Sequence, residues 1–144
     1  IGNSAVVADW RCDWVGIGLA EMLAVSGRRV RLVVNGAMAG ETLQLYVRNH
    51  YLGRLRRLGV EVTTNARLFG VDGDSAYFQD TLTDEPIVVD GTDTTVLSLG
   101  NTPRDELGAA LEQANIPFTR IGDCLAPRTA EEAVLEGLQA AWEI

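Results

Sequence analysis

The sequence predicts an α/β protein with a Rossmann-like, three-layer fold: a parallel sheet, helices and a small antiparallel β-meander. Three observations predict this class. Over residues 4–63, apolar β-branched runs alternate with helical stripes, the order typical of a parallel sheet. Over residues 66–89, short β-rich runs are separated by turns containing Asp and Gly. An apolar run at 94–99 then returns to the buried-strand pattern, and 144 residues suffice for a domain with a core.

The first part of the chain has the pattern β-α-β-α-β. Residues 4–8 and 30–34 are apolar runs of the kind that parallel strands show. Residues 16–26 between them predict a helix with Ile17 and Leu23 on one face. Residues 41–58 predict a longer helix ended by Gly59, and residues 60–63 predict a third strand. This is one Rossmann-type half.

The remaining elements follow in order. Residues 66–71, 76–79 and 86–89 predict the meander, with a hairpin turn at Asp72-Gly73-Asp74. Residues 94–99 predict a buried strand that stops at Gly100. A helix is expected over residues 105–115, a last strand over 117–121 and a last helix over 129–142.

Composition excludes several functions. The net charge of −8 argues against nucleic acid and against an anionic membrane surface as partners. Without lysine, the chain cannot form a Schiff base or a P-loop. Its two cysteines, which form no C-x-x-C, support neither a metal site nor a dithiol site, so we expect free thiols in a cytoplasmic protein. No run is long and apolar enough for a membrane helix. We identify no catalytic residue, and the single histidine, His50, is expected to be structural.

The first strand-to-helix turn is where a dinucleotide pyrophosphate is expected. It reads Asp-Trp-Arg-Cys-Asp-Trp-Val-Gly-Ile-Gly over residues 9–18, and of the G-x-G-x-x-G pattern it keeps only Gly16 and Gly18. These two glycines are candidates for phosphate approach or for close helix–strand packing. Asp9 and Asp13 would repel a pyrophosphate, and Arg11 could offset one of them. Asn35, after the second strand, is the candidate for the adenosine ribose, where an acid is usual.

A second candidate site lies near the end of the chain. The run Ile-Gly-Asp-Cys-Leu-Ala-Pro-Arg over residues 121–128 is expected to follow a strand and to precede a helix. That order would place Gly122, Asp123 and a helix N-terminus at the carboxyl edge of a sheet. Glycine allows close backbone approach, aspartate accepts sugar hydroxyls, and a helix N-terminus favours a pyrophosphate. The alternative role for Asp123 is a helix N-terminal acid.

These motifs resemble the C-terminal region of the old-yellow-enzyme-like flavoprotein family that includes trimethylamine dehydrogenase and 2,4-dienoyl-CoA reductase. The resemblance implies that residues 1–104 form an inserted NAD(P)/ADP-binding-like domain. It implies that residues 105–144 are the last strand and helix of a FAD-type domain whose remainder lies elsewhere. The reductases of the family bind NADPH in the inserted domain, whereas the trimethylamine dehydrogenase branch, with its degraded glycine motif, holds ADP there.

The resemblance also implies residue roles. Asp123 would contact ribityl or ribose hydroxyls, the backbone at Cys124 would face the pyrophosphate, and Gly100 would permit close approach between domains. The FMN domain, with its catalytic residues and an iron–sulfur cluster, would belong to the missing part of the parent. The expected partners are therefore a dinucleotide or ADP and that missing flavin domain, and the fragment alone is expected to be inactive.

Two other functions remain open. One is a stand-alone ADP- or NAD-binding module. The other is a structural or interaction module without a ligand, with Trp10 and Trp14 as a docking surface.

Overall fold

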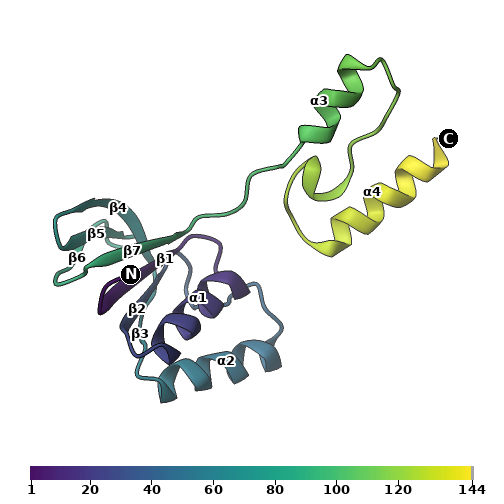
Figure 1. Ribbon diagram of the computed structural model, residues 1–144. Coiled ribbons are helices and arrows are strands. Elements are labelled where there is room, and N and C mark those ends of the chain that lie inside the picture. Colours follow the sequence, from purple (N-terminus) through teal and green to yellow (C-terminus); the bar gives the residue numbers. More distant parts are fainter. Residues whose placement is uncertain (144) are drawn as a thin grey trace. The chain divides into compact units, whose positions relative to one another are not determined.

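The computed structural model describes residues 1–143 and divides the chain into two compact units, residues 1–100 and residues 101–144. The first unit holds all of the strands among the described residues, and the second holds two α-helices and a 3-10 turn (Figure 1). That the second unit belongs to a FAD-type domain stays a prediction.

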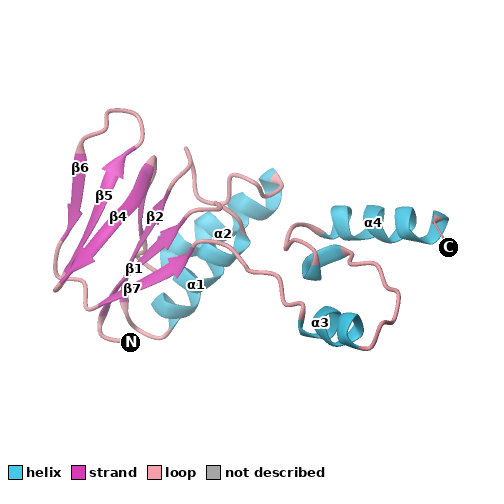
Figure 2. Ribbon diagram, turned by 90° about the horizontal axis from the view of Figure 1, so that it is seen from above, coloured by secondary structure: helices cyan, strands magenta, loops and turns pink. Residues whose placement is uncertain are grey.

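A four-stranded parallel sheet organises the first unit, in the order β3-β2-β1-β7. Its strands are β1 (Ser4–Asp9), β2 (Arg29–Val34), β3 (Glu61–Thr63) and β7 (Thr94–Ser98). The register places Asp9 opposite Val34 on one side and opposite Ser98 on the other, so the carboxyl ends of three strands lie level (Figure 2).

Two helices, α1 (Trp14–Val25) and α2 (Leu45–Arg57), cover one face of this sheet. Ala5, Val7 and Leu32 point to this face, where they pack with Ile17 of α1 and Leu55 of α2 in one buried cluster. Because β1 is apolar at every position from 5 to 8, it can bury both of its faces.

An antiparallel meander covers the opposite face. It consists of β4 (Ala66–Asp72), β5 (Ser75–Asp80) and β6 (Pro86–Val89), paired in that order. Phe78 and Ala76 of β5 pack there against Val6, Ala8 and Val33 of the parallel sheet. The turn between β4 and β5 is the predicted one, and Gly73 adopts a φ of 57° that favours glycine. The predicted fold class is confirmed.

The second unit contains α3 (Glu106–Gln113), the 3-10 turn η1 (Gly122–Cys124) and α4 (Ala130–Trp142). Thr129 begins α4 with a capping box, in which its side chain accepts from the third helical N–H and Glu132 accepts from the backbone N–H of Thr129. Among residues 101–143 only Gly108 and Gly122 are buried, so no apolar side chain in this range is buried.

Two expectations were wrong in detail. Residues 117–121 do not form the predicted last strand; Ile121 has extended dihedral angles, but no strand of the described chain pairs with it. A strand is held by its neighbour's hydrogen bonds, and this unit offers none. The second helix begins at Leu45 rather than near residue 41, because the preceding residues fold back: Thr42 donates its backbone N–H and hydroxyl to the carbonyl of Cys12.

Candidate functional site

The first candidate site lies at the carboxyl edge of β1, β2 and β7. The backbone N–H of Asn35 donates to the carbonyl of Asp9 (3.0 Å), and that of Trp10 donates to the carbonyl of Ser98 (3.0 Å). A Cβ on Gly100 would lie 3.6 Å from Cδ of Arg11. The structure therefore places two of the predicted residues, Asn35 and Gly100, around the turn between β1 and α1.

The Asp9 carboxyl group lies inside this turn. Asp9 is only 2% exposed, and its Oδ1 accepts hydrogen bonds from the backbone N–H groups of Arg11 and Cys12, both at 3.2 Å. Ser98 Oγ lies 3.4 Å from the same oxygen. Oδ2 is buried and has no hydrogen-bond partner among the described residues. Burial above all, with repulsion by Asp13, raises the pKa of Asp9, and the hydrogen bonds oppose this.

Gly16 lies directly against this carboxyl group. A Cβ at Gly16 would sit 2.8 Å from Cβ of Asp9 and nearer still to its carboxyl atoms. Gly16 is the third residue of α1 and is buried, whereas a Cβ at Gly18 would have no atom within 4 Å. Of the two roles considered for Gly16, close helix–strand packing is the one that this contact supports.

Other acidic side chains occupy the donors around the turn. Asp13 is the N-cap of α1 and accepts from the N–H of Val15 at 2.9 Å, while also pairing with Arg11 at 2.9 Å. Glu41 accepts from the N–H of Ala37 at 3.2 Å. Glu41 was expected inside a helix, and sequence reasoning missed its part in this edge.

Cys12 completes the inner side of the turn. Its thiol is buried and accepts the N–H of Gly36 at 3.2 Å, and its backbone adopts a φ of 53°. Burial, more than any other factor, raises the pKa of this thiol, so it stays protonated at neutral pH. Both cysteines, Cys12 and Cys124, are free thiols, as predicted.

The two tryptophans of the turn are exposed. Trp10 is 46% and Trp14 is 67% exposed, so each presents ring surface to solvent at the mouth of the turn. At that position either ring can cover an adenine or serve as the expected docking surface.

The second candidate site is built differently from the expectation. Gly122, with φ of 62°, donates its N–H to Oε2 of Glu136 at 2.6 Å, and Arg128 pairs with the other oxygen of the same carboxylate. Asp123 lies exposed in η1, and the thiol of Cys124 donates to the carbonyl of Ile121 at 3.0 Å. The backbone N–H of Gly122 therefore already donates to Glu136, and no local sequence pattern predicts this hydrogen bond.

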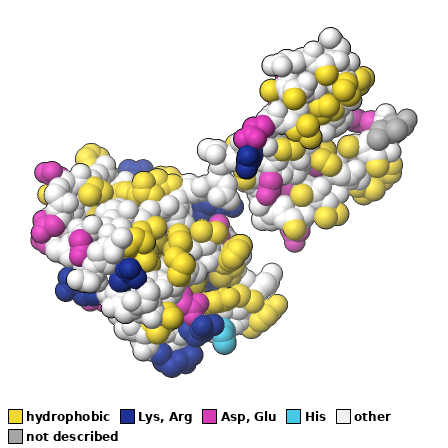
Figure 3. Space-filling model, viewed as in Figure 1, with side chains coloured by type: hydrophobic (Ala, Val, Ile, Leu, Met, Phe, Trp, Pro, Cys, Tyr) yellow, Lys and Arg dark blue, Asp and Glu magenta, His cyan; other side chains and the backbone are white. Residues whose placement is uncertain are grey.

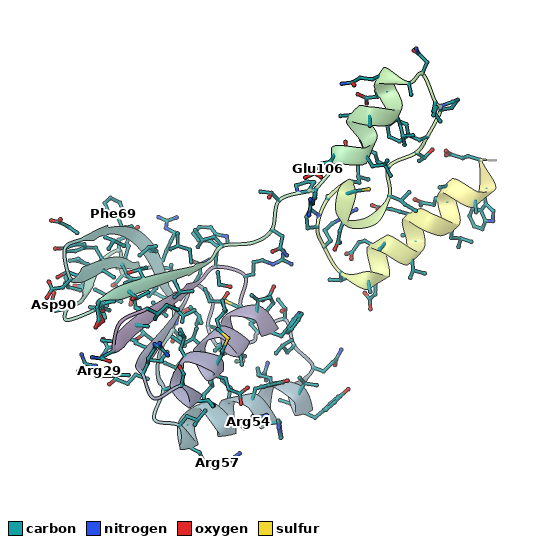
Figure 4. The ribbon with its side chains drawn as sticks, in the orientation of Figure 1. Arg29, Arg54, Arg57, Phe69, Asp90 and Glu106 are labelled. Atoms are coloured by element: carbon teal, nitrogen blue, oxygen red, sulfur yellow. The ribbon has the colours of Figure 1, made fainter. Side chains whose placement is uncertain are left out.

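Two further features lie away from the carboxyl edge. The helix α2 carries four arginines, Arg48, Arg54, Arg56 and Arg57, of which Figure 4 labels Arg54 and Arg57. Arg54 pairs with Glu21 of α1. A hollow of about 140 Å³ near Arg29 and Asp90 lies at the amino ends of β1 and β2. In open α/β sheets, ligands bind at the carboxyl ends, so this hollow is not the expected site.

No group of three metal-ligating side chains occurs among residues 1–143. The helices in this range also lack the length and apolar character needed to cross a membrane.

Comparison with known proteins places this fold. No protein-family model and no curated protein match the chain. Among solved structures, histamine dehydrogenase from Rhizobium sp. 4-9 matches 99% of this chain with 23% of its own, at a TM-score of 0.83 and 24% identity. 2-Naphthoyl-CoA reductase, solved in complex with 2-naphthoyl-CoA, matches 100% of this chain with 21% of its own, at a TM-score of 0.79 and 21% identity.

A more distant match is the flavoprotein disulfide reductase RclA from Escherichia coli, which covers 99% of this chain and 36% of its own at a TM-score of 0.60 and 13% identity. The fold is therefore one that occurs within larger oxidoreductases, flavoproteins among them. The chain spans less than a quarter of the first two matches.

Proposed function

We propose that this chain is the nucleotide-binding part of a multidomain flavin-dependent oxidoreductase and does not itself carry the catalytic FMN domain. One observation carries the proposal. After β3 the chain crosses to the other side of β1 and returns as β7, so the strand order reverses between β1 and β7. Ligands of open α/β sheets bind outside the carboxyl ends at such a switch point.

The ligand that we propose for this edge is an adenine nucleotide, either ADP or NAD(P). Asn35 follows β2 at the place where a ribose hydroxyl is usually bound, and its amide can donate to or accept from that hydroxyl. Gly18 leaves open space beside α1, and the exposed ring of Trp10 or Trp14 can cover the adenine. Gly100, with φ of 117°, lets the chain turn away from β7 beside this edge.

The second unit supports the proposal that the parent is longer. No apolar side chain over residues 101–143 is buried, and Figure 3 shows apolar side chains on the surface of this unit. Those that are about half exposed or more are Leu107, Ile116, Leu125, Val134, Leu135, Leu138 and Trp142. Exposed apolar side chains gathered in one small unit are typical of a surface that contacts another protein. We propose that the protein surface it contacts is the remainder of a FAD-type domain. Asp123 and the backbone at Cys124 would then face the dinucleotide of that domain.

A purely structural module is the second candidate function. The observation that favours it is the occupation of the N–H donors of the β1–α1 turn by the chain's own acids, Asp9 and Asp13. A domain of that kind would keep the fold and bind no nucleotide.

Titration of the purified chain with ADP, NADH, NADPH and FAD in turn tests the proposal. Calorimetry measures binding, and tryptophan fluorescence reports on the turn when it is recorded on a Trp142→Phe chain, in which only Trp10 and Trp14 remain. ADP binding to which the nicotinamide adds nothing supports a nucleotide-binding scaffold without hydride transfer. Clearly tighter binding of NADH or NADPH supports a reductase. If none of the four binds and adenosine does not bind either, the proposal for residues 1–100 is wrong and the structural module takes its place.

A further inference from the structure

The carboxyl group of Asp9 occupies the space in front of the first turn of α1. It lies against Gly16, the third residue of that helix, and is closed off from solvent. A pyrophosphate bound in the usual way needs this space, because it sits at the N-terminus of the helix that follows the first strand. Protein atoms fill it here.

The polar contacts in that space favour a ligand group that donates hydrogen bonds and disfavour an anionic one. Oδ1 of Asp9 already accepts hydrogen bonds from the backbone N–H groups of Arg11 and Cys12 in the turn. Oδ2 is buried with no donor among the described residues, so its lone pairs are unmatched. A phosphate oxygen approaching it would find a second acceptor and a like charge in place of an N–H group.

Arg11, the cationic residue of this turn, does not reverse this balance. Arg11 has its Nε 2.9 Å from the carboxylate of Asp13, so its charge is already paired. Asp13 in turn caps α1 through the N–H of Val15. The positive end of the helix is therefore already compensated by the carboxylate of Asp13, its N-cap.

We infer that Asp9 is a specificity-determining residue that keeps the diphosphate of a nucleotide away from the N-terminus of α1, so that this edge selects for the nucleoside part of its ligand. The inference rests on the proposed nucleotide site. It differs from that proposal because it names the part of the ligand that is recognised and the residue that rejects the rest.

The test compares adenosine with ADP on the wild-type chain and on two variants, by calorimetry at one fixed salt concentration. Asp9→Asn removes the charge but keeps the shape and the oxygen that accepts from Arg11 and Cys12. Asp9→Ala also opens the space. Asp80→Asn is the matched control, because Asp80 likewise accepts two backbone N–H groups, from Leu82 and Thr83, in a turn of the meander.

On the wild-type chain we expect adenosine to bind at least as tightly as ADP. We expect Asp9→Ala, which removes the charge and opens the space, to tighten ADP binding by about tenfold or more, and Asp9→Asn, which removes the charge but keeps the space filled, to tighten it less. Adenosine binding should stay within about twofold in both Asp9→Asn and Asp80→Asn, and ADP binding should not change in Asp80→Asn.

Three outcomes would overturn the inference. One is ADP binding to the wild-type chain tenfold more tightly than adenosine, which needs no variant and so does not depend on their folding. Another is unchanged ADP affinity in Asp9→Asn and Asp9→Ala while ADP still binds, which leaves the nucleotide site standing and removes only the role of Asp9. The third is no binding of either ligand to any of the chains, which overturns the proposed function as well.

Discussion

An added methyl group should have opposite effects at two glycines of the same helix. In the interior of a helix, replacing glycine by alanine usually stabilises a protein by about 0.5–1 kcal/mol. Gly18→Ala should follow that rule, since its new Cβ would meet no atom within 4 Å. Gly16→Ala should not, because its Cβ would lie 2.8 Å from Cβ of Asp9 and still nearer the carboxyl group.

The size of the effect at Gly16 follows from what must move. Inserting a methyl group into a packed site costs about 1–3 kcal/mol. Asp9 cannot swing away freely, because its Oδ1 holds the N–H groups of Arg11 and Cys12, and each such bond contributes about 1 kcal/mol. With one of these hydrogen bonds lost and the gain in helix propensity subtracted, Gly16→Ala should lower the free energy of unfolding by about 1–3.5 kcal/mol.

Urea unfolding followed by far-ultraviolet circular dichroism measures both variants against the wild-type chain. A double variant, Gly16→Ala with Asp9→Ala, completes a mutant cycle, and in the Asp9→Ala background the added methyl should no longer destabilise. If Gly16→Ala proves as stabilising as Gly18→Ala, then the Asp9 carboxyl does not fill the space in front of α1. Asp9 could then not exclude a diphosphate from that space.

Three further predictions concern pH, packing and capping. Burial raises the pKa of Asp9, so the folded chain holds this proton to higher pH than the unfolded chain, and the free energy of unfolding should fall as pH rises from about 4 through the raised value. Asp9→Asn should remove that decline, and parallel pH curves for the two chains would contradict it. Phe78→Ala should cost about 3–5 kcal/mol in urea unfolding because Phe78 is buried between the two sheets. The matched Phe69→Ala, at a side chain that is 84% exposed, should cost less than about 1 kcal/mol, and equal losses would refute the layer assignment. Thr129→Ala should speed amide exchange in the first turn of α4 by about fivefold to thirtyfold, since a lost cap costs about 1–2 kcal/mol, whereas Glu131→Ala, outside the capping box, should not.

Much of the fold could be predicted because its signals are local. The strand β1 is predicted by its apolar run and the turn between β4 and β5 by its Asp-Gly sequence, and each pattern spans only a few residues. The predicted strand over residues 117–121 failed for the opposite reason. Its β-branched and aromatic residues favour extended backbone, but a strand also needs a partner, and no local pattern reveals whether one is present.

The candidate site was harder to predict than the fold. The sequence indicated that Asp9 and the late glycines made an unusual first turn. It did not show that Gly16 accommodates the carboxyl group of Asp9, since that contact depends on how α1 packs on β1. Glu41 and Glu136 were also missed, because each takes a backbone N–H across a turn whose shape the residue types alone do not determine.

The absence of buried apolar side chains over residues 101–143 has a consequence for any unfolding experiment on this chain. The slope of unfolding free energy against urea and the heat-capacity change both scale with the surface that unfolding exposes. Residues 101–143 have little such surface to expose, so both quantities should match those of a protein of about 100 residues rather than one of 144. The melting temperature of the whole chain would then report on residues 1–100, and α3 and α4 would need a local probe of their own.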